Sequence, residues 1–169
     1  NKAKQKPTAL NEFLRYHCNV RVAATERAIS QETWSACAGE LSDWSSAERI
    51  HGGIDLGRSY DFTAVGECAE FRDRDDNGEV FSRYEIRAKT WTCEERDDRM
   101  KQERIDRWIG DGLLECSNGD AVNIDDVQNY IIDRSLMNTI GTWAYDKTFA
   151  QQLAMHLQND HGIVVFPFT

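Results

Sequence analysis

The sequence predicts an α/β fold built on one mixed β-sheet, for three reasons. A hairpin signal, Asn77-Gly78, separates two strand-like segments in the first half of the chain. Helical and strand-like segments then alternate toward the C-terminal end. With 169 residues, of which 40% are hydrophobic and 29% are charged, the chain is long enough for one globular domain with a core. We expect an arm at residues 1–49 and the sheet domain at residues 50–169.

The first three strands are expected to form a meander. Residues 50–56 and 62–71 are the first two strands, and a charged turn at residues 72–78 follows them. Residues 80–91 alternate apolar and polar side chains, which is the pattern of a third strand.

Helices and strands are expected to alternate after the meander. Residues 94–108 are rich in charge and indicate a solvated helix, and residues 124–137 place apolar side chains at helical spacing. A buried strand at 139–145, a helix at 148–159 and a last strand at 163–168 complete the domain. This order, a meander followed by crossovers, implies a mixed sheet with helices on its faces, and it is the order of the RNase H-like fold.

The arm contains weaker helical signals. Apolar side chains near residues 10–14 fall at helical spacing, and Ser30, Thr33 and Trp34 indicate the start of a second helix. Residues 42–49 are expected to connect the arm to the sheet.

Charge and cysteine content narrow the function classes. The net charge of −9 argues against a protein that coats nucleic acid through basic side chains, but it is compatible with a DNA enzyme whose metal ions meet the phosphate. The five cysteines are scattered without a Cys-x-x-Cys pair, which predicts reduced thiols in a cytosolic compartment. The sequence has neither a signal-peptide pattern nor an apolar run long enough to span a membrane.

Two acids are the candidate site residues. Asp55 lies in the first strand among three glycines, and its neighbours Ile54 and Leu56 point to the opposite face. Asp146 ends a buried strand just before a helix, where open sheets collect functional groups. Each acid also has a structural interpretation: Asp55 as a turn-proximal residue of an edge strand, and Asp146 as a helix-start acid.

An RNase H-like sheet would make the strands of Asp55 and Asp146 neighbours. Carboxylate oxygens suit Mg²⁺ or Mn²⁺, and two such ions can activate water and stabilise the leaving oxygen of a phosphodiester. We therefore predict a metal site in which Asp55 and Asp146 are ligands and catalytic residues.

Two similar motifs point elsewhere. Residues 52–59 nearly match a phosphate-binding loop, but the middle of the motif is strand-like, which indicates coincidence. Gly53-Ile-Asp-Leu-Gly57 is similar to the first phosphate motif of actin-like ATPases, and this interpretation stays open as an alternative.

Taken together, four segments resemble the nuclease part of the large terminase subunit of tailed phages. Gly53-Ile-Asp-Leu-Gly-Arg-Ser-Tyr-Asp-Phe-Thr-Ala64 resembles the first nuclease motif, and Ala144-Tyr-Asp-Lys-Thr-Phe-Ala150 resembles the second acidic motif. Residues 108–127 resemble the middle section, and Phe13 to Asn19 with Trp34 resembles the connection to an ATPase domain.

The resemblance implies a metal-dependent endonuclease that cleaves concatemeric double-stranded DNA with two Mg²⁺ or Mn²⁺ ions. It implies Asp55 and Asp146 as the first two catalytic acids and Asp61 as a supporting residue. The family's third acid would come from beyond Thr169, so we expect a domain truncated at its C-terminal end that binds metal weakly and cuts DNA poorly.

The family also implies the surroundings of the protein. Its expected partners are double-stranded DNA, the small terminase subunit and the portal, without a membrane, in the cytoplasm of the infected bacterial host. Arg83, Arg87 and Lys89 alternate on the third strand and could face phosphate. A different class of function, a non-catalytic docking module of the packaging machine, would need no metal between the two acids.

Overall fold

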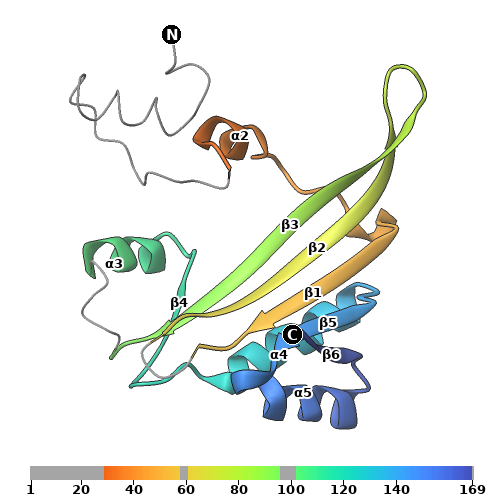
Figure 1. Cartoon of the computed structure of the whole chain (residues 1–169). Helices are drawn as coiled ribbons and strands as arrows, with labels where there is room; N and C mark the ends of the chain where they lie inside the picture. The colour runs from red at the N-terminus through yellow and green to blue at the C-terminus, as the bar shows by residue number, and fades with distance from the viewer. Residues whose placement is uncertain (1–28, 58–60, 96–101, 169) are drawn as a thin grey trace, which may run out of the picture. The chain divides into compact units, whose positions relative to one another are not determined.

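The computed structural model describes residues 29–57, 61–95 and 102–168 (Figure 1). The chain divides into two units, residues 1–40 and residues 41–169. In the first unit, helix α2 (Gln31–Ala36) begins at the predicted position, and the Ser30 side chain accepts a hydrogen bond from the Thr33 backbone N–H. The helical signals predicted near residues 10–14 lie outside the described residues. The domain boundary expected after residue 49 stays a prediction.

The second unit contains a six-stranded mixed sheet in the order β4-β3-β2-β1-β5-β6. β1, β2 and β3 form an antiparallel meander, while β5 pairs in parallel with both β1 and β6. This confirms the predicted mixed α/β architecture of the RNase H-like type. The strands are β1 (Arg49–Asp55), β2 (Thr63–Arg74), β3 (Val80–Cys93), β4 (Glu115–Ser117), β5 (Thr142–Asp146) and β6 (Val165–Phe168).

The predicted strand ends differ from the observed ones by up to three residues, and one strand was not predicted. β2 continues to Arg74 and the hairpin turn is shorter than predicted, because the Asp75 side chain accepts hydrogen bonds from the backbone of Asn77 and Glu79. Gly78 closes the turn with a φ of 82°. The sequence analysis missed β4, which pairs in parallel with the end of β3 and is only three residues long.

Three helices accompany the sheet. α4 (Ile124–Met137) has the predicted bounds, and α5 (Lys147–His161) begins one residue before its predicted start. α5 ends at Gly162, whose φ of 66° is a left-handed conformation that favours glycine. α3 (Gln102–Gly110) starts later than predicted, since residues 94 and 95 are not helical and residues 96–101 lie outside the described part. No described helix combines the length and apolar character needed to cross a bilayer.

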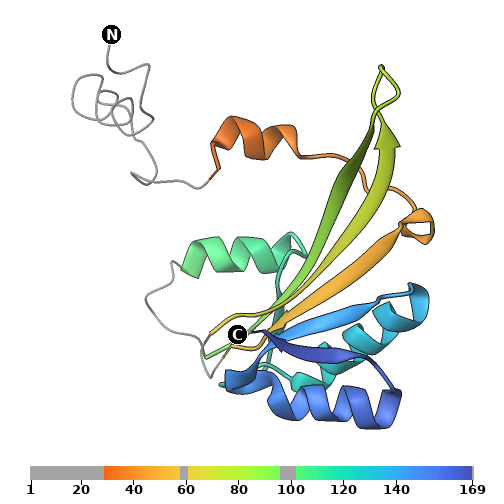
Figure 2. The ribbon, with the colours of Figure 1, turned by 45° about the vertical axis from the view of Figure 1, so that its right-hand side comes forward.

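The two faces of the sheet are different. α4 and α5 lie on one face of the sheet (Figure 2). Side chains of β1, β2, β3 and β5 join them in the main core. We call this the covered face, and it carries Ile54, Val65, Trp91 and Trp143. Side chains alternate along each strand, so Asp55 lies on the opposite face, which we call the open face.

Gly52 makes room for Trp143, one of two fully buried tryptophans in the main core. It pairs with Trp143 across β1 and β5, and a Cβ added at Gly52 would lie 2.0 Å from Cε3 of that indole. Trp143 is only 1% exposed, and its Nε1 donates a hydrogen bond to Ser135 Oγ at 3.0 Å. The pairing of β1 with β5 therefore depends on the absence of a side chain at residue 52.

We predict that Gly52→Ala lowers the free energy of unfolding by about 1–3 kcal/mol, because a buried indole has to move. Gly53→Ala is the matched control, since a Cβ there meets no heavy atom within 4 Å apart from its chain neighbours. The control should change the free energy of unfolding by about 0.5 kcal/mol or less. Urea unfolding measures both variants, and equal stabilities would contradict this packing.

Candidate functional site

Strand register brings Asp55 and Asp146 together on the open face. Ile54 of β1 pairs with Tyr145 of the parallel strand β5, and each acid is the next residue of its strand. Neighbouring strands lie about 4.8 Å apart, so the two acids sit side by side at the carboxyl ends of adjacent strands. Asp146 pairs in turn with Phe168 of β6.

Both acids line one pocket of about 370 Å³. Next to them runs a row of small residues, in which Gly66, Gly53 and Ala144 pair across β2, β1 and β5. No bulky side chain rises from this row, so the sheet backbone beside the acids is open to close approach. Among the described residues, the pocket is lined by Gly53, Ile54, Asp55, Ala64, Gly66, Ala144, Tyr145, Asp146 and Phe168.

The Asp55 carboxylate is exposed. Among the residues that the structure describes, none donates a hydrogen bond or forms an ion pair to it. Because this side chain is exposed, Asp55 does not carry the cost of burying a lone carboxylate. Asp55 instead stands out because its carboxylate oxygens face the pocket side of the sheet beside a second acid.

Asp146 lines the pocket and also has a structural role. It is the N-cap of α5, and its Oδ1 accepts a hydrogen bond from the Thr148 backbone N–H at 2.7 Å. Hydrogen bonds from the side chain and then the backbone of Thr148 hold the pKa of Asp146 below its ordinary value. The carboxylate is thus oriented by a helix N-terminus and is ionised at neutral pH.

Asp61 lies apart from the pair. It belongs to the connection between β1 and β2, where its side chain accepts a hydrogen bond from the backbone N–H of Phe62 at 2.8 Å. It does not line the acid pocket. Its supporting role stays a prediction.

The structure places the three basic residues of β3 on the covered face, opposite the face that carries Asp55 and Asp146. The expectation that they could face phosphate stays a prediction. Arg87 pairs with Glu67 across the sheet, and Lys89 pairs with Val65, which is fully buried. Their charges have acidic partners: Lys89 is ion-paired with Glu115, and Arg83 with Asp73 and Glu85.

Glu67 is the acid that sequence analysis missed. It is 1% exposed in the middle of β2 and accepts hydrogen bonds from Tyr130 Oη and Arg134 Nε of α4. The available signal was an acid at an inward position between Val65 and Ala69, with a tyrosine and an arginine four residues apart on one helix. Its place under α4 indicates a structural role.

The donor set of the pocket fits a hard divalent cation. Asp55 and Asp146 supply carboxylate oxygens, and neither histidine nor cysteine lines the pocket. Within residues 29–57, 61–95 and 102–168, no three or more acidic, histidine or cysteine side chains form a group that could hold a metal ion. The two acids could therefore supply two anionic ligands, and water or substrate oxygens would have to complete the coordination.

Comparison with known proteins gives one informative result. No protein-family model matches the sequence, and no curated protein matches it. The fold is similar to the crystal structure of the HK97 bacteriophage large terminase, with a TM-score of 0.62 and 24% sequence identity over 99% of this chain. This chain has the fold of one part of a phage large terminase. It spans 34% of the length of the HK97 protein.

We predict that Asp146→Ala lowers the midpoint of thermal unfolding by about 2–4 °C because α5 loses its cap, whereas Asp146→Asn, which still caps, stays near wild type. The folded-state pKa of Asp146 is lowered, so its stabilisation is complete above the ordinary pKa of 3.8 and is lost as the pH falls below it. Thermal scans at pH 7 and at pH 3 measure this. A deficit of Asp146→Ala that is as large at pH 3 as at pH 7 would argue against the cap.

Proposed function

We propose that this chain is the nuclease portion of a phage large terminase and that it cleaves double-stranded DNA with divalent metal ions. The observation that carries the proposal is the register of β1 and β5, which sets Asp55 beside Asp146 in one pocket. The similarity to the HK97 large terminase supports the same choice, because it extends over nearly the whole chain. The expected substrate is the concatemeric DNA that phage packaging consumes.

In this proposal, Asp55 and Asp146 hold the metal and thereby orient the phosphodiester. Mg²⁺ or Mn²⁺, when bound, supplies the positive charge that activates water and stabilises the leaving oxygen of the phosphodiester. Asp146 is held in position by Thr148, so its carboxylate needs little rearrangement on binding. Asp55 is the adaptable partner, because no described residue restrains its carboxylate.

The shape of the open face supports a bulky substrate. Gly53 and Gly66 have open space where a Cβ would be, and Ala144 extends the same row toward β6. A DNA backbone can therefore approach the sheet at the row next to the acids. Because the chain carries a net charge of −9, the metal ions would be the main source of attraction for phosphate at this pocket.

The proposal extends to the partners of the protein, to its location and to Asp61. The partners would be double-stranded DNA, the small terminase subunit and the portal, and the protein would act in the cytoplasm of the infected bacterium. Asp61 would support the site from the loop before β2.

We predict that Asp55→Asn and Asp146→Asn each weaken Mn²⁺ binding and slow Mn²⁺-dependent nicking of supercoiled plasmid on the order of 100-fold, because each removes one anionic ligand. Calorimetric titration with Mn²⁺ and a plasmid assay measure the two effects. Asp160→Asn is the control: this exposed acid lies near the end of α5, outside the pocket, and its loss should change neither.

The outcome separates the proposal from its alternatives. If Mn²⁺ binding and nicking survive both acid substitutions, these residues are not the metal ligands. Absence of metal binding in the wild-type chain would favour a non-catalytic docking module. Binding of ATP in the same calorimetric assay would favour an actin-like ATPase fragment.

A further inference from the structure

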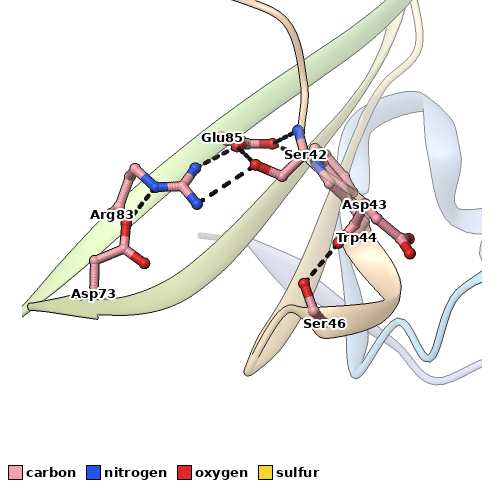
Figure 3. A network of polar contacts seen from close by, with 7 residues as sticks. All are labelled: Ser42, Asp43, Trp44, Ser46, Asp73, Arg83 and Glu85. Carbon is pink, nitrogen blue, oxygen red and sulfur yellow. Dashed lines mark hydrogen bonds and ion pairs between the residues drawn. The ribbon is translucent and has the colours of Figure 1, made fainter.

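Residues 42–46, which we call the clasp, contact β3 mainly through the carboxylate of Glu85. Glu85 accepts hydrogen bonds from the backbone N–H of Ser42 at 2.9 Å, from the Ser42 hydroxyl at 2.6 Å and from Trp44 Nε1 at 2.8 Å. Figure 3 shows Glu85 between these donors and Arg83, whose guanidinium also pairs with Asp73 at 2.6 Å. The clasp therefore depends on one anionic group that four donors share.

The clasp also has hydrogen bonds of its own, which do not depend on the sheet. It contains the 3-10 turn η2 (Trp44–Ser46), whose cap Asp43 accepts hydrogen bonds from the backbone and hydroxyl of Ser45 at 2.9 and 2.7 Å. These contacts are local and do not involve the sheet. Beyond Glu85, the clasp contacts the sheet through a hydrogen bond from Arg83 Nη2 to Ser42 Oγ at 3.5 Å and through Trp44, which is 4% exposed in a small core cluster with Ile50 and Phe71.

Arg87 continues the contacts from the clasp into the sheet. Its guanidinium lies over the Trp44 ring, 3.9 Å from the ring centroid, and its Nε is 4.0 Å from Glu67 Oε1. This Nε is buried and finds no hydrogen-bond partner among the described residues. Stacking on Trp44 and the charge of Glu67 therefore hold Arg87 in place.

Glu67 carries the same chain of contacts to α4. Tyr130 Oη donates a hydrogen bond to it at 2.7 Å, and Arg134 Nε lies 3.1 and 3.0 Å from its two oxygens. Burial and then the hydrogen bond to Glu67 raise the pKa of Tyr130 to about 12, so the phenol remains a donor at neutral pH. Contacts thus run from the clasp to α4 in three steps: ring stacking of Arg87 on Trp44, a 4.0 Å ion pair between Arg87 and Glu67, and the hydrogen bonds of Glu67 to α4.

We propose that the clasp is a detachable conformational device whose docking on Glu85 is coupled, through Arg87 and Glu67, to the packing of α4 against the sheet. The clasp directly follows residues 1–40 in the sequence. A force on residues 1–40, or a rearrangement of them, would therefore act on the clasp first and, through the coupling, on α4. This coupling does not require the acids to be catalytic.

Hydrogen exchange of the 169-residue chain, without metal or DNA, tests the coupling. Glu85→Gln keeps the size of the side chain but removes its charge, and we expect exchange of residues 42–46 to rise about tenfold or more, with a smaller rise in residues 130–137. Trp44→Phe keeps a ring under Arg87 and loses only the Nε1 donor, so it should give a weaker effect in the same direction. This milder variant keeps the test valid if Glu85→Gln does not fold.

The same exchange measurement can also be made from the other end, because two coupled sites influence each other equally. Tyr130→Phe removes one hydrogen bond to Glu67 at the far end of the chain of contacts, and it should raise exchange in the clasp. Glu115→Gln is the control, since it breaks the ion pair with Lys89 on β3 without touching the clasp or Glu67. Unchanged exchange of residues 42–46 in Glu85→Gln and Trp44→Phe would overturn the proposal, and so would an opened clasp that leaves α4 unaffected.

The pH dependence gives an independent check. Burial, the largest single influence, raises the pKa of Glu85, but hydrogen bonds from Ser42, Trp44 and Arg83 together lower it to about 2. The charged groups around it are Arg83 with Asp73 on the hairpin, and Arg87 on the same strand. Because the folded-state pKa is lowered, the stabilisation is complete above the ordinary pKa of 4.5 and is lost as the pH falls toward 2.

Tryptophan fluorescence should therefore report release of the clasp between about pH 4.5 and pH 2 in the wild-type chain. Glu85→Gln should lack this transition, because its clasp is already loosened at neutral pH. A transition of the same size in Glu85→Gln would overturn the assignment to Glu85.

Discussion

The parallel pairing of β1 with β5 is the constraint on which the rest of the molecule depends. It places the carboxyl ends of two strands, distant in the sequence, next to each other on the open face. The pairing is possible because Gly52 leaves the Trp143 indole its space on the covered face. The register of β1 against β5 thus determines both the packing of the core on the covered face and the position of the two acids on the open face.

The two faces of the sheet carry different kinds of side chains. Apolar packing and a buried polar network occupy the covered face, where Glu67 joins β2 to α4 and Glu85 joins β3 to the clasp. The open face has small residues and two carboxylates at its centre. Most of the packing therefore lies on one face and the proposed chemistry on the other, and Asp146 belongs to both because it lines the pocket and caps α5.

Much of this arrangement could be predicted from local patterns. The periodic apolar residues of α4 gave its bounds, and Asp146 was placed correctly at the junction of a strand and a helix. β4 could not be predicted, because three residues carry no periodic signal and their pairing is decided by the end of β3. The alternation of β3 showed that Arg83, Arg87 and Lys89 share a face, but only their partners on β2 decide that it is the covered one. Local patterns therefore locate strands and acids, whereas tertiary pairing decides what each face meets.

The central claim is that Asp55 and Asp146 bind the same divalent metal centre. Crystals of the chain soaked in Mn²⁺ test it most directly, because the anomalous signal locates the ion without any assumption about activity. We expect an anomalous peak within about 2–2.5 Å of oxygens from both carboxylates. Mn²⁺ bound only elsewhere, or an empty map at this pocket with both side chains well ordered, would contradict the claim.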